Sequence, residues 1–239
     1  MIISNSRKYI FVHLHKTAGT AITREFESHA QWNDIVLSGA YRGNVRHEWF
    51  DENYGLETHS SAIAIKNVVS DAVWDEYFTF SFVRDPYRRM LSLYTWLDGL
   101  ISSKKGLRWF ERYVFPNKGI WPWPGTKACL ESKNFSDFIR HPLMQDGAPG
   151  AAKMVDSLFD SGDVLVDFVG KLESLDEDVK YIRSQLGMAH TEVKRTNSTK
   201  AKIDPNQYYQ SQADLDLVYE RYREDFEAFD YQKKQVGEL

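Results

Sequence analysis

The chain has 239 residues and a formal net charge of −4, with the apolar and charged fractions of an ordinary globular protein. This charge excludes a generally basic nucleic-acid-binding protein, so any anionic ligand must be met by local positive charge. The single cysteine, Cys129, excludes an intrachain disulfide and a thiolate metal cluster, which favours a reducing compartment. We find no signal peptide and no bilayer-spanning apolar run, and therefore expect a cytoplasmic protein.

The first predicted elements are a strand, a loop of small residues and a helix. Tyr9–Leu14 is a β-rich run bounded by polar residues. After the loop His15–Gly19, Thr20 is expected to cap a helix that extends to about Ser28. This order is typical of the start of a nucleotide-binding α/β unit. Residues 31–54 are predicted to be an irregular connection.

The remaining pattern predicts one α/β domain over residues 1–239. We expect a P-loop-like three-layer arrangement, in which a central parallel sheet is flanked by helices, plus a Trp-rich insertion over about residues 101–134. The predicted elements in chain order are a helix over 61–69, a strand over 77–83, a helix from Pro86 to about Leu100, a strand over 163–170, a helix to about Leu186 opened by the capping-box pattern Ser174 to Glu177, and an amphipathic helix over 214–229.

The loop before the first helix has the features of an anion site. Backbone N–H groups and the helix dipole favour a phosphate or sulfate there, and Ala18 and Gly19 let an anion approach the backbone. Lys16 adds a positive charge, and Thr17 and Thr20 add hydroxyl donors. The lysine precedes the glycine, so the pattern is not the usual triphosphate loop. The alternative is a structural turn with one exposed lysine.

A second candidate site follows the strand over residues 77–83. Arg84 lies at the carboxyl end of this strand, where open α/β sheets bind ligands. Ser92 follows eight residues later, about two helical turns on, so both side chains can reach one phosphate monoester. Arg88 and Arg89 add positive charge nearby. The alternative is an ion-pair network of Arg84 and Asp85 that caps the helix.

The two sites together resemble the sulfotransferase superfamily. Residues 11–20 are similar to its 5′-phosphosulfate-binding loop, and residues 80–94 to its 3′-phosphate-binding segment. The segment His59–Ala62 before a helix resembles the carbohydrate branch, which includes heparan sulfate 2-O-sulfotransferase and bacterial relatives. Residues 168–173 and 225–231 also fit that branch. The resemblance covers most of the chain outside the Trp-rich insertion.

The resemblance implies transfer of a sulfuryl group from 3′-phosphoadenosine 5′-phosphosulfate (PAPS) to an acceptor hydroxyl, with adenosine 3′,5′-bisphosphate as the product and no metal. Lys16 would stabilise the leaving group, and Arg84 and Ser92 would hold the 3′-phosphate. His59 would be the general base, since an imidazole titrates near neutral pH. The 5′ end of the donor would be held by Thr17, Ala18, Gly19 and Thr20.

The histidines leave alternatives open. His59 could instead cap a helix or lie on the surface. His13, on a strand, is expected to be packed, whereas His15 touches the loop and could contact the donor or the acceptor. His15 also departs from the family pattern, which usually has proline before the loop lysine.

Two further regions are candidate contacts. The basic loop with Lys194, Arg195, Asn197, Ser198 and Lys200 could close over the nucleotide or receive an anionic acceptor, and is otherwise a solvated surface loop. From it we predict Arg195 and Ser198 as donor contacts and Lys200 as an acceptor contact. Trp109, Trp121 and Trp123 could stack on an acceptor or pack the insertion onto the core, and Trp121, Trp123 and His15 join the predicted acceptor contacts.

Two rival functions remain. A P-loop kinase or NTPase could use Asp167, at the end of the run Val164–Asp167, as a magnesium-binding aspartate. A non-catalytic nucleotide-binding module is the second rival. The sequence does not identify the acceptor: sugars, peptide tyrosine and small alcohols stay open, and only the resemblance favours a carbohydrate. It predicts no nucleic-acid partner and no membrane span, and it is silent on the oligomeric state.

Overall fold

The computed structural model describes residues 1–38, 47–102, 122–145, 148–189 and 203–239. The chain divides into two compact units. The first comprises Met1–Arg84 and Met154–Ala201, and the second comprises Asp85–Lys153 and Lys202–Leu239. Whether these units fold as one domain over residues 1–239 stays a prediction, because this division does not test independent folding.

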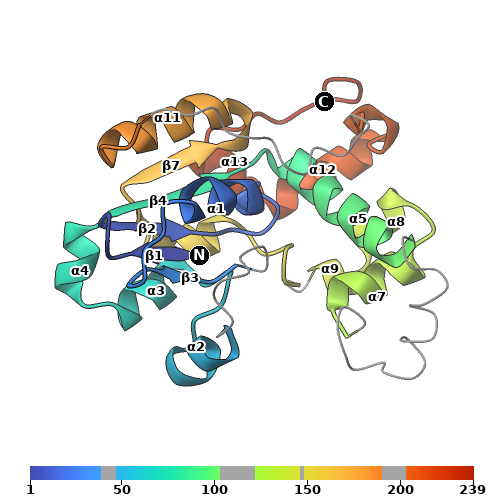
Figure 1. Ribbon diagram of the computed structural model, residues 1–239. Coiled ribbons are helices and arrows are strands. Elements are labelled where there is room, and N and C mark those ends of the chain that lie inside the picture. The colour runs from blue at the N-terminus through green and yellow to red at the C-terminus, as the bar shows by residue number, and fades with distance from the viewer. Residues whose placement is uncertain (39–46, 103–121, 146–147, 190–202) are drawn as a thin grey trace. The chain divides into compact units, whose positions relative to one another are not determined.

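The first unit contains a five-stranded sheet with the order β3-β1-β2-β4-β7 (Figure 1). Strands β2, β4 and β7 pair in parallel, whereas β1 is antiparallel to both of its neighbours. The sheet is therefore mostly parallel, and the expectation of a wholly parallel sheet is wrong for β1. Only residues 5–8 separate β1 from β2, too few for the crossover that a parallel pair needs. The strands are β1 (Ile2–Ser4), β2 (Tyr9–Val12), β3 (Ile35–Val36), β4 (Phe78–Val83) and β7 (Phe168–Lys171).

Helices α1 and α11 cover one face of this sheet. Alternate residues of β2 and β4 point toward these helices because successive side chains of a strand face opposite sides. The buried cluster on this face includes Tyr9, Phe11, Phe80 and Phe82 from the strands, Ile22 and Phe26 from α1, and Val179 and Ile182 from α11. The other elements of the unit are smaller. The bounds are α1 (Gly19–Glu27), α2 (His47–Tyr54), α3 (Ala62–Val68), α4 (Asp71–Glu76), α10 (Val155–Leu158), β5 (Phe159–Asp160), β6 (Asp163–Val164), the 3-10 helix η1 (Leu172–Ser174) and α11 (Leu175–Gln185).

Several boundaries differ from the sequence-based expectation. The connection predicted over residues 31–54 contains β3 and α2, and the strand predicted over 163–170 is split between β6 and β7. The residue that caps α1 is Ala18 rather than Thr20. The capping box at Ser174 does not form: its hydroxyl donates to Asp178 at 2.7 Å. That carboxylate also accepts the Lys171 N–H, and thus links β7 to α11.

The second unit is helical in its described part. The final helix, predicted over 214–229, is two helices that meet at Tyr222, whose buried hydroxyl donates to the Ala151 carbonyl at 2.7 Å. No helix within the described ranges is long and apolar enough to cross a bilayer. Of the predicted Trp-rich insertion, residues 103–121 lie outside the described residues. The bounds are α5 (Pro86–Ser102), α7 (Pro124–Glu131), α8 (Phe135–Arg140), α9 (Pro142–Gln145), the 3-10 helix η2 (Pro205–Gln207), α12 (Gln212–Arg221) and α13 (Arg223–Ala228).

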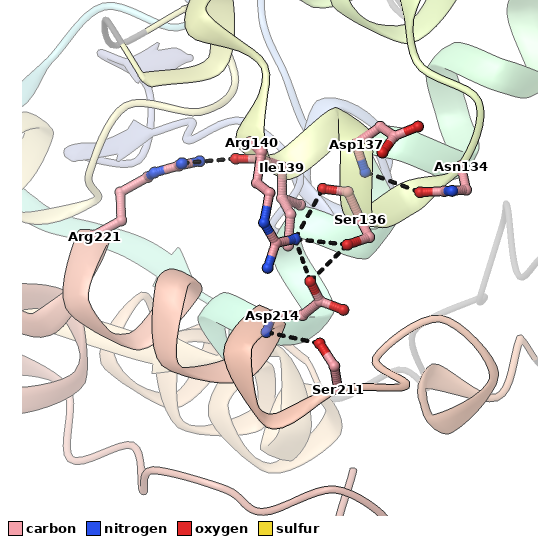
Figure 2. Close-up of polar contacts among 8 residues, drawn as sticks. All are labelled: Asn134, Ser136, Asp137, Ile139, Arg140, Ser211, Asp214 and Arg221. Carbon is pink, nitrogen blue, oxygen red and sulfur yellow. Dashed lines mark hydrogen bonds and ion pairs between the residues drawn. The ribbon is translucent and has the colours of Figure 1, made fainter.

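A polar network joins α8 to α12 inside this unit (Figure 2). The buried carboxylate of Asp214 accepts hydrogen bonds from the Ser136 hydroxyl at 2.7 Å and from the Arg140 guanidinium. Ser211 caps α12 by accepting the Asp214 N–H, and Arg221 donates to the Ile139 carbonyl at 2.7 Å. A buried carboxylate is tolerated only when it is paired, so these contacts fix how the two helices pack.

Candidate active site

The two motif segments lie at the same edge of the sheet. Because β2 and β4 are parallel neighbours, the loop after Val12 and the residue after Val83 both leave from their carboxyl ends. The Arg84 guanidinium reaches across and donates to the backbone carbonyl of Lys16 at 3.3 Å. Lys16 and Arg84, separated by 68 positions in the chain, therefore belong to one site.

The loop between β2 and α1 has an unusual backbone. Lys16 and Ala18 have φ angles of 65° and 64°, in the left-handed region that costs a residue with a side chain about 1 kcal/mol or more. Successive residues that alternate in this way turn their N–H groups toward a common point and form an anion-binding nest. Thr17, which is buried between them, donates a hydrogen bond from its hydroxyl to the Leu14 carbonyl at 3.1 Å. This bond ties the loop to the chain that precedes it.

The start of α1 completes this nest. Its N-cap residue is Ala18, which has no side-chain oxygen, so no side chain caps the first turn. The first N–H groups of a helix have no partner within the helix, and together with the helix dipole they favour a bound anion. The arrangement therefore suits the anion site predicted for residues 16–20 better than the alternative of a plain structural turn.

Lys16 is electrostatically strained. Burial and, as the smaller cause, the positive charge of Arg84 lower the pKa of its ammonium group to about 8. The group is still mostly protonated at pH 7. Two like charges that meet at one sheet edge repel each other, and an anion bound between them would relieve that repulsion.

His59 has a defined protonation pattern. Its Nδ1 lies 2.9 Å from the backbone carbonyl of His13. A carbonyl only accepts hydrogen bonds, so Nδ1 carries the proton and Nε2 presents a lone pair. Burial lowers the His59 pKa to about 4, which keeps the ring neutral at pH 7. The helix-capping alternative for His59 is wrong, because Ser61 caps α3 through its hydroxyl.

The three histidines that the sequence leaves as rivals form one cluster with His59 in the middle. The His15 ring is stacked on His59 with centroids 3.5 Å apart, and the His13 ring meets it edge-on at 4.5 Å. His13 is buried as expected, and its Nδ1 has no hydrogen-bond partner among the described residues. Its ring fills the space beside Gly19, where a Cβ atom would lie 1.8 Å from His13 Cδ2.

Asp167 is not at this edge of the sheet. It precedes β7, and its carboxylate accepts hydrogen bonds from the N–H and hydroxyl of Thr79 at 2.7 and 2.9 Å. Thr79 lies near the amino end of β4, so Asp167 is at the edge opposite the Lys16 loop. Asp167 precedes a strand instead of ending one, so it does not stand where the kinase hypothesis needs a magnesium ligand.

Comparison with known proteins decides the family. The model of the Sulfotransferase family matches residues 1–232. The chain belongs to the sulfotransferase family. The sulfotransferase match covers both described units and confirms the resemblance carried by the two motif segments.

Several curated relatives of this chain share the name carbohydrate sulfotransferase 10. The chain is similar to carbohydrate sulfotransferase 10 of Rattus norvegicus, with 27% identity over 239 residues, which cover 85% of this chain and 61% of the relative. The Xenopus laevis protein of that name is 24% identical over 263 residues, 98% of this chain and 67% of the relative. This chain therefore spans about three fifths of the length of the rat relative. No solved structure gave a significant match.

Other residues predicted for the site lie elsewhere. Ser92 is half-buried in α5 of the second unit, where Asp85 caps the helix by accepting the Arg88 N–H at 3.0 Å. Its convergence with Arg84 on one phosphate stays a prediction. Trp123, also in the second unit, stacks on Trp96 with centroids 5.9 Å apart. Outside the described residues lie Trp109, Trp121, Lys194, Arg195, Asn197, Ser198 and Lys200.

Proposed function

We propose that this sulfotransferase transfers a sulfuryl group from PAPS to a hydroxyl group of a carbohydrate. The observation that carries the proposal is the contact between Arg84 and the Lys16 carbonyl, which places two cations and an uncapped helix start at one sheet edge. Membership of the family supports the reaction class, and the name of the curated relatives supports a carbohydrate acceptor.

The residues present fit the donor. PAPS carries a 5′-phosphosulfate and a 3′-phosphate, and both are anions. The N–H groups of the nest, the hydroxyl of Thr20 and the ammonium of Lys16 would hold the 5′ end. Arg84 would hold the 3′-phosphate, since a guanidinium binds phosphate oxygens in pairs, and the resemblance assigns Ser92 to the same group.

The chain's own groups supply positioning and proton transfer. When bound, PAPS provides a sulfuryl group that is already electrophilic, so the protein mainly aligns the partners and stabilises charge. Lys16 would stabilise the negative charge that grows on the leaving phosphate. His59 would accept the acceptor's hydroxyl proton at Nε2 while its Nδ1–H stays bonded to the His13 carbonyl. The resulting imidazolium would thus remain anchored.

The experiment is a sulfuryl-transfer assay with PAPS and a panel of oligosaccharides, read by the mass of the sulfated product. His59→Ala should lower turnover about a hundredfold or more, because general base catalysis is worth that much, and should leave binding of adenosine 3′,5′-bisphosphate intact. Lys16→Ala should lower turnover by a comparable factor. Lys8→Ala, a surface lysine paired with Glu76, is the control and should match wild type. Full turnover in His59→Ala would exclude this residue as the base.

A further inference from the structure

The proposed reaction gives no role to His15, whose ring is stacked on His59. The hydrogen bond of His59 to the His13 carbonyl holds one edge of its ring. The His13 ring also meets the imidazole, with centroids 4.5 Å apart and planes 65° apart, so both of these contacts come from His13. The His15 ring lies over the face of His59, with centroids 3.5 Å apart and planes 30° apart. An edge contact and a face contact together define the plane of the ring.

We propose that His15 is a positioning residue for His59: its stacked ring holds the base in the plane that keeps Nδ1–H on the His13 carbonyl and Nε2 turned outward for the acceptor proton. The inference rests on the proposed role of His59. The two rings lie face over face in van der Waals contact, so the stack can restrain the His59 side chain without a hydrogen bond. No proton passes through His15 in this scheme.

The two residues that contact His59, His13 and His15, are themselves held in place. The ring of His13 is buried and packs beside Gly19, which leaves its carbonyl a fixed acceptor for His59. His15 immediately precedes Lys16, whose φ angle of 65° shows that the backbone is tightly constrained there. Lys16, the proposed cation for the donor, and His15, whose ring lies over His59, are therefore consecutive residues. The position of one side chain depends on the position of the other.

His15 is also a feature of this chain rather than of its family's loop pattern, which usually has proline at this position. A proline ring has no π face and cannot stack as an imidazole does. The proposal does not depend on which acceptor is used.

The test is nuclear magnetic resonance of the ring nitrogens in full-length protein labelled with ¹⁵N-histidine, with the His59 signals assigned from His59→Ala. In wild type we expect the tautomer with the proton on Nδ1 and slow exchange of that proton. In His15→Ala we expect a mixture of tautomers and exchange about three- to tenfold faster, which is the range that a stacked ring pair provides. His15→Phe keeps the stack and should restore the wild-type pattern.

His29→Ala, two residues beyond the C-terminal end of α1, is the matched control and should leave the His59 signals unchanged. Binding of adenosine 3′,5′-bisphosphate, followed by calorimetry, should be the same in wild type and His15→Phe. Should His15→Ala fail to fold, His15→Asn, which is planar but not aromatic, takes its place. Wild-type His59 signals in His15→Ala or His15→Asn, or a failure of His15→Phe to restore them, would overturn the proposal. The NMR signals are measured without turnover. The role of His15 can therefore fail this test while the transfer assay supports the proposed reaction, and the transfer assay can fail while the His59 signals behave as expected.

Discussion

At the scale of single residues, the packing of the loop between β2 and α1 depends on the absence of a side chain at Gly19. The His13 ring occupies the space that a Cβ atom would need, and both Cδ2 and Nε2 would lie 1.8 Å from it. The same ring meets His59 at 4.5 Å, and the His13 carbonyl holds His59 Nδ1. A methyl group at position 19 would therefore disturb His59 as well as the loop.

Gly19→Ala should destabilise the protein by about 1–3 kcal/mol, the usual cost of overpacking a buried site. Urea denaturation followed by circular dichroism measures this change. Gly99→Ala is the control, because nothing lies within 4 Å of a Cβ atom there and the residue is in α5. Alanine in a helix interior is more favourable than glycine by about 0.5–1 kcal/mol, so this variant should be slightly more stable. Equal stability of the two variants would contradict the packing of His13 against Gly19.

At the scale of elements, the second unit depends on the carboxylate between α8 and α12 (Figure 2). Burial alone would raise the pKa of Asp214, but hydrogen bonds from Arg140, Ser136 and Ser211 outweigh it and lower the pKa below the usual range. A carboxyl group with a lowered folded pKa adds stability above its unfolded pKa near 4, and that stability is lost as the pH falls through the folded value.

Asp214→Ala should cost about 1–3 kcal/mol at pH 7, because the Ser136 hydroxyl and the Arg140 guanidinium lose their hydrogen bonds to this buried carboxylate. The difference from wild type should shrink as the pH falls from about 4 through the lowered folded pKa, because the carboxyl is protonated first in the unfolded chain and only then in the folded one. Thermal unfolding from pH 7 to pH 3 measures both effects. Asp216→Ala, two positions on in α12, removes an exposed pair with Lys233 and a hydrogen bond from the Gln212 amide, and should change stability by less than about 1 kcal/mol. A larger loss of stability in Asp216→Ala than in Asp214→Ala would show that the Asp214 network is not what joins these helices.

Elements with a strong local pattern could be predicted from the sequence. The strands β2 and β4 carry buried aliphatic and aromatic residues, and Pro86 begins α5 as expected. Helix α2 was missed because none of its residues is buried, so no apolar stripe reveals it. The break at Tyr222 was missed because it contains neither glycine nor proline and depends on a hydrogen bond to the distant Ala151 carbonyl.

The site was predictable only where it is contiguous. The residues of the loop 16–20 and Arg84 could be found because each stands in a recognisable stretch next to a strand end. The hydrogen bond that sets the tautomer of His59 could not, since it joins residues 46 positions apart through a backbone atom. The alternation of His13 and His15 at the end of β2 was a signal, but a pattern does not say that one ring lies beside His59 and the other over it.

At the scale of the whole molecule, the proposed function requires a single site that would recognise two phosphate groups of the donor. Its two cations, Lys16 and Arg84, both belong to the first unit and meet through one hydrogen bond. A site built for the 5′ end alone would need only the loop and the start of α1. The presence of Arg84 at the same edge is what predicts preference for a nucleotide with a further phosphate.

The most direct test is calorimetric titration of the wild-type protein and Arg84→Ala with adenosine 3′,5′-bisphosphate and with adenosine 5′-monophosphate. The account predicts that wild type binds the bisphosphate at least about tenfold more tightly, the worth of one charge-assisted contact, and that Arg84→Ala loses this preference. Equal affinity of wild type for the two nucleotides, or an unchanged preference in Arg84→Ala, would contradict it.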